Sequence, residues 1–305
     1  MSKIILLIFL LFGSFLFSQS DTSLKIIVLG VAQDGGYPHI GCSRNCCNLA
    51  WKNDSVKKNV VALALINSKE KKWWLFEATP DINKQLKLFS VLTNSLYNYL
   101  PDGIFITHAH IGHYTGLMQL GREAMNAKEV PVYVLPKMKE YLEKNGPWSQ
   151  LVSLKNIVLN PLTENKALSI NHISVEAFTV PHRDEYSETA GFKINSGVKK
   201  YLFIPDIDKW SKFKTNIVSL VKESDVAFLD ATFFSAEELA YRNVKEVPHP
   251  FVEESMKLFE KEDLKTKNKV HFIHFNHTNP LLNNKSVQDK VLKEGYRISE
   301  EGGAY

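Results

Sequence analysis

The sequence predicts an α/β protein in which two sheets are flanked by helices within a single domain. Apolar runs of strand length are grouped in each half of the chain, and segments with helical spacing lie between them. No linker rich in Pro, Gly or Ser divides the 305 residues. The composition, 44% hydrophobic and 23% charged, is typical of a folded globular protein and excludes the disordered and collagen-like classes.

The first half begins with a strand at 25–31 that opens onto a glycine-rich loop at 33–41. Residues 60–66 and 73–76 are predicted to form a hairpin around the polar turn 67–70, and the Trp73-Trp74 pair is expected to pack against the sheet. The other strands are predicted at 103–107 and 130–135, and the helices at 81–91, 114–125 and 137–144.

The second half repeats this grouping of strands and helices. Its predicted strands are 173–180, 189–194, 200–204, 226–229 and 269–275. Its predicted helices are 211–222, 251–259 and 287–294.

Residues 1–20 are predicted to be a secretory signal peptide, followed by a single domain at 21–305. Lys3 precedes the apolar run 4–12, and small or polar residues follow it. The run is shorter than the roughly 20 apolar residues of a membrane-spanning helix, although an uncleaved anchor is the alternative. No cysteine stands at the junction, which argues against a lipoprotein. We therefore expect a periplasmic or secreted protein without a stable membrane span after cleavage.

The charge pattern argues against a nucleic-acid partner. Thirty-seven Lys and Arg stand against 33 Asp and Glu, and the net charge of +4 is spread without long runs of one sign. A nucleic-acid-binding domain usually carries a basic stripe. We expect a small-molecule substrate instead, and the sequence leaves open whether the chain forms a homodimer.

Three cysteines, Cys42, Cys46 and Cys47, lie within six residues of one another. Disulfides that hold a secreted fold are spread along the chain, and adjacent cysteines pair only with severe strain. The cluster therefore indicates a metal site or a reactive thiol, with a free or disulfide-bonded cluster as the alternative.

The strongest chemical signal is a turn with three histidines, His108, His110 and His113, at the end of the predicted strand 103–107. Residues i and i+2 of an extended chain share a face, so His108 and His110 point the same way. His113 can swing back toward them at the start of the following helix. Three neutral imidazoles that converge at a strand end suit zinc or another divalent metal of similar character.

Other candidate ligands also end predicted strands. They are His182, Asp206, His274 and, three residues later, His277. His271 lies on the opposite strand face from His274 and is expected to pack or face solvent, while His172 and His249 have no ligand-like context. Tyr114 is expected to pack at the start of a helix.

The histidine turn and the later single ligands resemble the metallo-β-lactamase superfamily. The resemblance extends from about residue 25 to the C-terminus and implies a four-layer αβ/βα sandwich with a metal centre at one edge of the paired sheets. The glycine-rich start, residues 76–82 and residues 274–280 are similar, more narrowly, to the PQQ-biosynthesis B proteins. That branch is related to cyclic phosphodiesterases of phosphonate utilisation.

The resemblance implies two metal positions. One metal would be held by His108, His110 and His182, a second by His113 and His274, and Asp206 would bridge the two. The metals implied are one or two zinc ions, with iron or manganese also compatible.

One position departs from the family pattern, which places an aspartate just before the third histidine where this chain has Gly112. We expect the first metal position to be intact and the second weakened, with water or a neighbour such as Asp230 in the vacated place. The alternative is that the turn requires a positive φ at Gly112.

The resemblance also implies a structural zinc near the cysteines. The related branch carries Cys-x-Cys-x-x-Cys here, and its fourth ligand is a histidine three residues after the last catalytic one. This chain has Arg44 in place of the middle cysteine and an additional Cys46. The implied set is Cys42, Cys46, Cys47 and His277, with His39 as a further candidate.

The predicted metal ligands and the family resemblance lead to three candidate functions. The first is an exported metal-dependent hydrolase of a small ester or phosphodiester, in which metal-activated water attacks and Asp206, or a histidine displaced from the metal, transfers the proton. The second is a PQQ-biosynthesis-like role, either oxidative chemistry or the handling of a quinone precursor. The third is a metal-binding protein whose catalysis has lapsed through Gly112.

Overall fold

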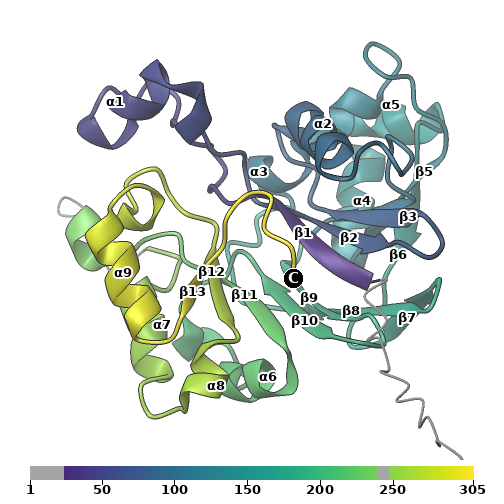
Figure 1. Cartoon of the computed structure of the whole chain (residues 1–305). Helices are drawn as coiled ribbons and strands as arrows, with labels where there is room; N and C mark the ends of the chain where they lie inside the picture. The colour runs from purple at the N-terminus through teal and green to yellow at the C-terminus, as the bar shows by residue number, and fades with distance from the viewer. Residues whose placement is uncertain (1–23, 240–246) are drawn as a thin grey trace, which may run out of the picture.

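The structure is a computed structural model of the chain, and it describes residues 24–239 and 247–305. Two sheets pack face to face, and helices cover both outer faces, as Figure 1 shows. This is the predicted metallo-β-lactamase-type α/β architecture. The signal peptide predicted at 1–20 lies outside the described residues.

The first half forms a six-stranded sheet whose neighbours follow the chain order β1 to β6. The first three strands form an antiparallel meander, which confirms the predicted hairpin, and β3 to β6 run parallel. The strands are β1 Leu24–Gly30, β2 Ala62–Asn67, β3 Lys72–Phe76, β4 Gly103–Phe105, β5 Val130–Val134 and β6 Ile157–Pro161. The helices are α1 Asn45–Lys52, α2 Ile82–Leu92, α3 Ile111–Tyr114, α4 Pro136–Lys144 and α5 Trp148–Ser153.

The second half forms a seven-stranded sheet ordered from β13 back to β7. Strands β10 to β13 are parallel, and β7 to β10 are antiparallel. The strands are β7 Ala167–Ile170, β8 Ile173–Thr179, β9 Ala190–Asn195, β10 Lys200–Ile204, β11 Val226–Asp230, β12 Val270–Ile273 and β13 Arg297–Ile298. The helices are α6 Ile217–Glu223, α7 Val252–Leu258, α8 Leu264–Lys267 and α9 Lys285–Lys293.

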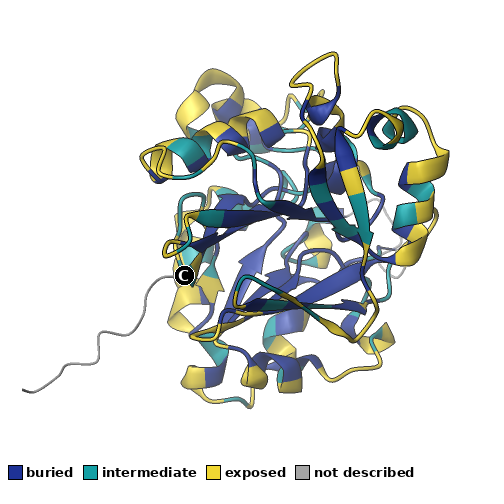
Figure 2. Cartoon of the chain, turned by 90° about the vertical axis from the view of Figure 1, so that its right-hand side faces the viewer, coloured by how far each residue is buried: buried dark blue, intermediate teal, exposed yellow. Residues whose placement is uncertain are grey.

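The core has two layers on either side of the first sheet because β1, β2 and β3 are buried on both faces. Trp73 faces the helices and stacks on Phe89 of α2, with ring centroids 3.8 Å apart. Its neighbour Trp74 faces the other sheet. This alternation is the period of two that a strand imposes, and Figure 2 shows both sheets buried between partly exposed helices.

The helix predicted at 114–125 is wrong in type and length. The chain forms the short α3 and then a 3₁₀ helix, Thr115–Leu120. The reason lies at Gly116, whose N–H donates to the carbonyl of Ala78 at 2.8 Å instead of continuing an α-helix. A Cβ at this glycine would lie 2.1 Å from the carbonyl oxygen of Thr79, so the two backbones are in direct contact.

The helix predicted at 211–222 begins later, at Ile217. The Asn216 side chain accepts hydrogen bonds from the N–H groups of Val218 and Ser219 and so caps α6 at this point. Elements α1, α5, α8, β6, β7 and β13 were not predicted from the sequence. Among the described residues no helix has the length and apolarity needed to cross a membrane.

The topology brings the candidate ligands to one edge. Strands β10, β11 and β12 are parallel neighbours, so their carboxyl ends lie side by side. Asp206, Asp230 and His274 stand at or just beyond these ends. A hydrogen bond of 3.0 Å from the N–H of Ala190 to the carbonyl of Thr107 joins this edge to the end of β4, where the histidine turn begins.

The C-terminal residues extend the first sheet beside β1. The N–H of Ile26 donates to the carbonyl of Tyr305 at 3.1 Å, and the N–H of Tyr305 donates back at 2.9 Å. Figure 1 marks the chain end at this position. Just before this segment, Glu301 accepts a hydrogen bond from the N–H of Asn59, and burial raises the pKa of Glu301 to about 7.

This raised pKa predicts a pH-dependent stability. Above the ordinary pKa of 4.5 the unfolded chain loses the Glu301 proton while the folded chain keeps it. The free energy of unfolding should therefore fall as pH rises from 4.5 to about 7 and level off above, by at most about 3 kcal/mol from this residue. Glu301→Gln should abolish this contribution, so urea unfolding at pH 5 and pH 8 should show the variant gaining stability relative to wild type at pH 8.

The exposed neighbour Glu300 offers a matched control. Glu300→Gln should follow the wild-type pH profile. A Glu301→Gln variant with the same pH profile as wild type would contradict the prediction.

Candidate metal centre

The histidine turn is held by contacts to the strand beside it. His108 and His110 follow β4 in extended backbone, and His113 lies within α3. The carbonyl of His113 accepts from the N–H of Ala78 at 2.8 Å, and the N–H of Thr107 donates to a carboxylate oxygen of Glu77 at 3.2 Å. The three imidazoles consequently gather, with ring centroids of His108 lying 4.4 Å from His110 and 4.2 Å from His113.

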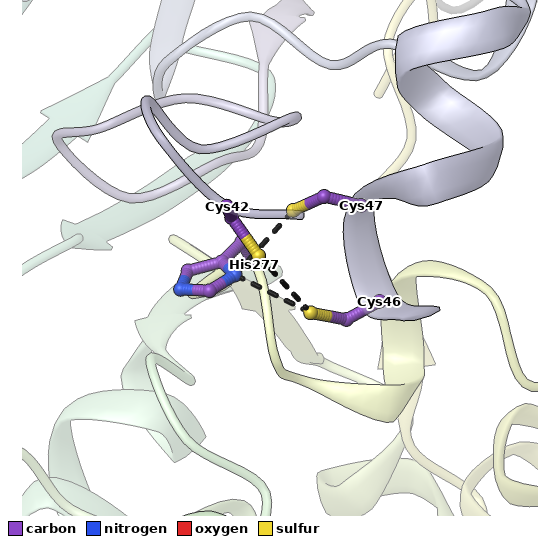
Figure 3. A group of neighbouring side chains, drawn as sticks. All are labelled: Cys42, Cys46, Cys47 and His277. Atoms are coloured by element: carbon purple, nitrogen blue, oxygen red, sulfur yellow. Dashed lines mark hydrogen bonds between the residues drawn. The ribbon is translucent and has the colours of Figure 1, made fainter. Parts of the chain in front are cut away.

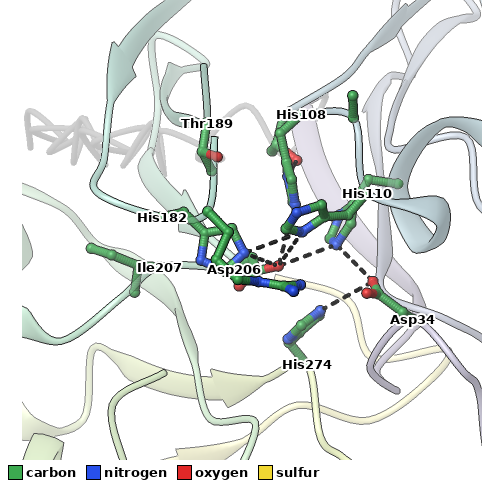
Figure 4. Close-up of polar contacts among 12 residues, drawn as sticks. Asp34, His108, His110, His182, Thr189, Asp206, Ile207 and His274 are labelled. Atoms are coloured by element: carbon green, nitrogen blue, oxygen red, sulfur yellow. Dashed lines mark hydrogen bonds and ion pairs between the residues drawn. The ribbon is translucent and has the colours of Figure 1, made fainter. Parts of the chain in front are cut away.

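Asp206 lies at the centre of the site, in contact with histidines of both halves. Its Oδ2 atom is 3.1 Å from Nε2 of His182, 3.3 Å from Nε2 of His108 and 3.9 Å from Nδ1 of His110. The same oxygen is 3.6 Å from Nε2 of His113. Figure 4 shows the labelled histidines and Asp34 converging around this carboxylate.

The second half of the site contains a residue that sequence reasoning missed. Oδ1 of Asp34, from the loop after β1, is 3.1 Å from Nε2 of His113 and 3.9 Å from Nε2 of His274. Asp34 lies in the predicted glycine-rich loop 33–41, and no pattern in the sequence linked it to the histidines.

Gly112 was expected from the sequence analysis to leave the second half one carboxylate short, with water or a neighbour such as Asp230 in the vacated place. The structure places Asp34 there instead. A Cβ at Gly112 would lie 2.1 Å from Oδ1 and 2.6 Å from Cα of Asp34, so Asp34 occupies the space beside this glycine. The φ of Gly112 is outside the left-handed region, so the alternative that the turn requires a positive φ is also wrong.

His249 was also missed by the sequence analysis, which found no ligand-like context for it. Its Nδ1 is 2.9 Å from Oδ2 of Asp230 and 3.2 Å from Oδ1 of Asp206. Burial would lower the pKa of His249, but the charges of Asp230 and Asp206 raise it to about 10. Asp206, Asp230, His249 and His274 form a third buried group able to hold a cation.

Three polar residues fix the orientation of the histidines by contacting their other ring nitrogens. Oγ1 of Thr107 is 2.8 Å from Nδ1 of His108, and Oγ1 of Thr232 is 2.8 Å from Nδ1 of His274. A carboxylate oxygen of Glu77 is 3.2 Å from Nδ1 of His113. Such contacts turn the Nε2 atoms inward and are typical of histidines that bind metals.

The residues fit a divalent metal. Nε2 of His108, His113 and His274, and Oδ1 of Asp34, are buried and have no hydrogen-bond partner among the described residues. Buried polar atoms normally have a partner, so these converging atoms are suited to bind a cation. Burial lowers the pKa of His108 well below its usual value, which keeps this imidazole in the neutral form that metals bind.

The carboxylates of the site are held in the charged form. Burial alone would raise the pKa of Asp206, but the charges of His182 and His249 hold it well below its usual value. Burial likewise opposes ionisation of Asp34, and the neighbouring imidazoles of His113 and His274 lower its pKa well below its usual value. Buried anions of this kind require positive charge nearby, which a bound metal supplies.

The three cysteines and His277 form a separate cluster, shown in Figure 3. Nδ1 of His277 is 3.4 Å from Sγ of Cys47 and 3.6 Å from Sγ of Cys46, and Sγ of Cys42 is 3.6 Å from Sγ of Cys46. Ligands on a tetrahedral zinc with Zn–S of about 2.3 Å and Zn–N of about 2.0 Å lie roughly 3.5–3.8 Å apart. The cluster therefore has the dimensions of a zinc site.

The other histidines behave differently from these ligand candidates. His39 stacks on His277 with ring centroids 4.5 Å apart, but its Nδ1 contacts the carbonyl of Ile40 and it lies outside the cysteine group. His271 packs against Phe228 and Tyr305, as expected. Tyr114 also packs as expected, in a ring cluster with Tyr141 and Trp148.

A cavity of about 810 Å³ lies between the two clusters. This volume is within the range of small-molecule sites. His249 and Thr232 line it on the side of the histidine centre, and His277 lines it on the side of the cysteines. Two arginines, Arg44 and Arg183, also line it.

Comparisons with known proteins agree with this geometry. The family profile described as "Beta-lactamase superfamily domain" matches residues 72–275. The chain is 25% identical to "Coenzyme PQQ synthesis protein B" of Gluconobacter oxydans (strain 621H), covering 92% of this chain and 97% of that protein. It is 22% identical to the protein of the same name from Methylorubrum extorquens (strain PA1), covering 92% and 98%.

Two solved structures share the fold. Zn(2+)-bound PqqB from Methylobacterium extorquens superposes with a TM-score of 0.73 at 19% identity, covering 92% of this chain and 99% of that one. A diphosphatase from the PhnP family superposes with a TM-score of 0.67 at 20% identity, covering 92% and 96%. The matched profile covers most of the chain and includes most of the histidine centre, so the protein belongs to the metallo-β-lactamase superfamily.

Proposed function

We propose that the protein is a metal-dependent hydrolase of a small phosphodiester or other anionic ester. The observation that carries this proposal is the position of Asp206, a buried carboxylate between two groups of inward-facing histidines. His249, which contacts Asp206, lines a cavity of small-molecule size. Two cations that share one carboxylate form the kind of centre that hydrolyses phosphate esters.

In this proposal each residue has a definite task. His108, His110 and His182 would hold one metal, His113 and His274 would hold the second, and Asp206 would serve both. Bound metal lowers the pKa of water and polarises the scissile bond. Because Asp230 and Asp206 engage Nδ1 of His249, Nε2 of that residue is the atom left to donate a proton to the departing group. Asp206, the proton-transfer residue favoured from the sequence, is assigned to metal binding here.

The substrate class follows from the charges in the cavity. Arg183 immediately follows His182, and Arg44 lies beside the cysteines, and both line the same cavity. Its acidic lining residue, Glu238, has a pKa that burial raises. Guanidinium groups bind phosphate and carboxylate through paired hydrogen bonds. An anionic substrate therefore suits the cavity better than a neutral ester does.

We assign zinc to the cysteine cluster and zinc, iron or manganese to the histidine centre. We also propose that the protein is exported, on the basis of the N-terminal segment.

The second candidate function is PQQ-biosynthesis-like, and similarity to coenzyme PQQ synthesis protein B over 92% of the chain favours it.

Metal removal and restoration test the proposed hydrolase. The metal-free protein should not hydrolyse bis(p-nitrophenyl) phosphate, and zinc or manganese should restore turnover to at least about 10³-fold above the metal-free level. The neutral p-nitrophenyl acetate should be a poorer substrate. No hydrolysis by the metal-loaded protein, together with a single iron after native purification, would contradict the hydrolase and favour the second candidate.

A further inference from the structure

We propose that Asp34 is a ligand of the second metal and supplies the carboxylate that residue 112 cannot supply. The second metal would then be bound by Asp34, His113, Asp206 and His274. The inference rests on the proposed function only in assuming that a second metal binds.

The distances support this ligand set. Nε2 of His113 lies 3.1 Å from Oδ1 of Asp34 and 3.6 Å from Oδ2 of Asp206, and Asp34 lies 3.9 Å from Nε2 of His274. Ligands about 2.0–2.1 Å from one tetrahedral zinc are separated by roughly 3.4 Å. The ligand atoms of Asp34, His113 and His274 lie within 4.8 Å of one another, and Asp206 reaches this group through its contact with His113.

The loop that carries Asp34 is fixed beside the last histidine. The N–H of Gln33 donates to the carbonyl of Phe275 at 2.9 Å, immediately after His274. Ala32 bridges to both Phe275 and Val60, so the loop is held from two sides. The position of Asp34 is thus set by the same backbone that sets His274.

Gly112 makes the close approach of this loop possible. A Cβ at Gly112 would overlap both the carboxylate and the Cα of Asp34. A side chain at residue 112 and the present position of Asp34 are therefore mutually exclusive.

Asp230 is the rival carboxylate, and its contacts make it the weaker candidate. Its Oδ1 already accepts from the N–H and the hydroxyl of Thr232, at 2.8 and 2.7 Å. Its Oδ2 accepts from the N–H of Ile207 at 3.0 Å and contacts His249. Oδ1 of Asp34, in contrast, is buried without a hydrogen-bond partner among the described residues. The unsatisfied oxygen is the one that a cation would complete.

The test is metal stoichiometry and affinity in the full-length protein, measured by mass spectrometry of bound metal and by zinc titration against a chromophoric chelator. Asp34→Asn should lose one equivalent of zinc or bind it at least about 100-fold more weakly. Gly112→Ala should lose the same equivalent, because its methyl group displaces Asp34. Both variants should retain the first metal and the zinc of the cysteine cluster.

Two controls match these changes. Asp54→Asn alters an aspartate that is paired with Lys57 at the surface, and Gly146→Ala adds a methyl group where no atom lies within 4 Å. Both should bind metal as wild type does, and thermal unfolding should show that all four variants fold.

Wild-type stoichiometry and affinity in Asp34→Asn would overturn the inference, as would loss of the second metal in His249→Gln but not in Asp34→Asn. Since the readout is bound metal, this inference can fail while hydrolysis is observed, and it can hold if hydrolysis is absent.

Discussion

Replacing Asp206 by Asn is expected to remove metal from both positions of the centre and to lower turnover by about 10³-fold or more. The carboxylate is 2% exposed and lies within 3.6 Å of Nε2 of His108, His113 and His182. An amide keeps the shape but removes the negative charge that the two halves share, and its NH₂ group cannot bind a cation. The loss should therefore exceed that from any single histidine.

The measurement is bound metal per chain, alongside hydrolysis of bis(p-nitrophenyl) phosphate. Asp208→Asn is the matched control, because this carboxylate lies two residues further on and pairs with Lys212 at 2.6 Å. The control should keep wild-type metal content. An Asp206→Asn protein that retains both metals would show that the two halves bind independently of this residue.

The strands could be predicted because a buried strand is recognisable from its own short run of apolar residues. A strand buried on both faces is a nearly continuous apolar run, as β2 and β11 are up to their last residues Asn67 and Asp230, and such runs are visible in the sequence. The helix expected at 114–125 failed for a non-local reason. Gly116 is in contact with the backbone of Ala78 and Thr79, nearly forty residues earlier in the chain, and this contact ends the helix.

The residues of the site also fall into two groups, those that the sequence indicated and those that only the folded chain reveals. His108, His182, Asp206 and His274 could be found because each follows an apolar strand, and their grouping follows from the sheet topology. Asp34, Glu77 and His249 lie in turns or loops where polar residues are ordinary, so only the folded chain distinguishes them. Gly112 was informative for the opposite reason. The missing side chain was visible in the sequence, whereas the residue that fills its space was not.

The cysteine cluster supports the other prediction with a large expected effect. Helix α1 stands apart from the two sheets in Figure 1, and its small core consists of Ala32, Tyr37, Cys47 and Ala50. With so few buried apolar residues, a metal link from the cysteines to His277 should contribute much of the stability of this segment. Structural zinc sites contribute on the order of 10 kcal/mol in small peptides. Cys47→Ser should therefore lose this zinc, lower the free energy of unfolding by several kcal/mol and lower Tm by about 10 °C.

Calorimetry and limited proteolysis at residues 42–52 would measure this loss. Ala50→Ser is the control, because it places a hydroxyl at another fully buried position of the same helix.

Burial raises the pKa of Cys47 to about 12, so its thiolate forms only when metal displaces the proton. The zinc should therefore be released as pH falls. Chelation in the Asp206→Asn background reports this zinc alone, since that variant lacks the other metals. Destabilisation by a thiol reductant but not by a chelator would indicate a disulfide instead. Equal stability of Cys47→Ser and wild type would show that α1 is held without metal.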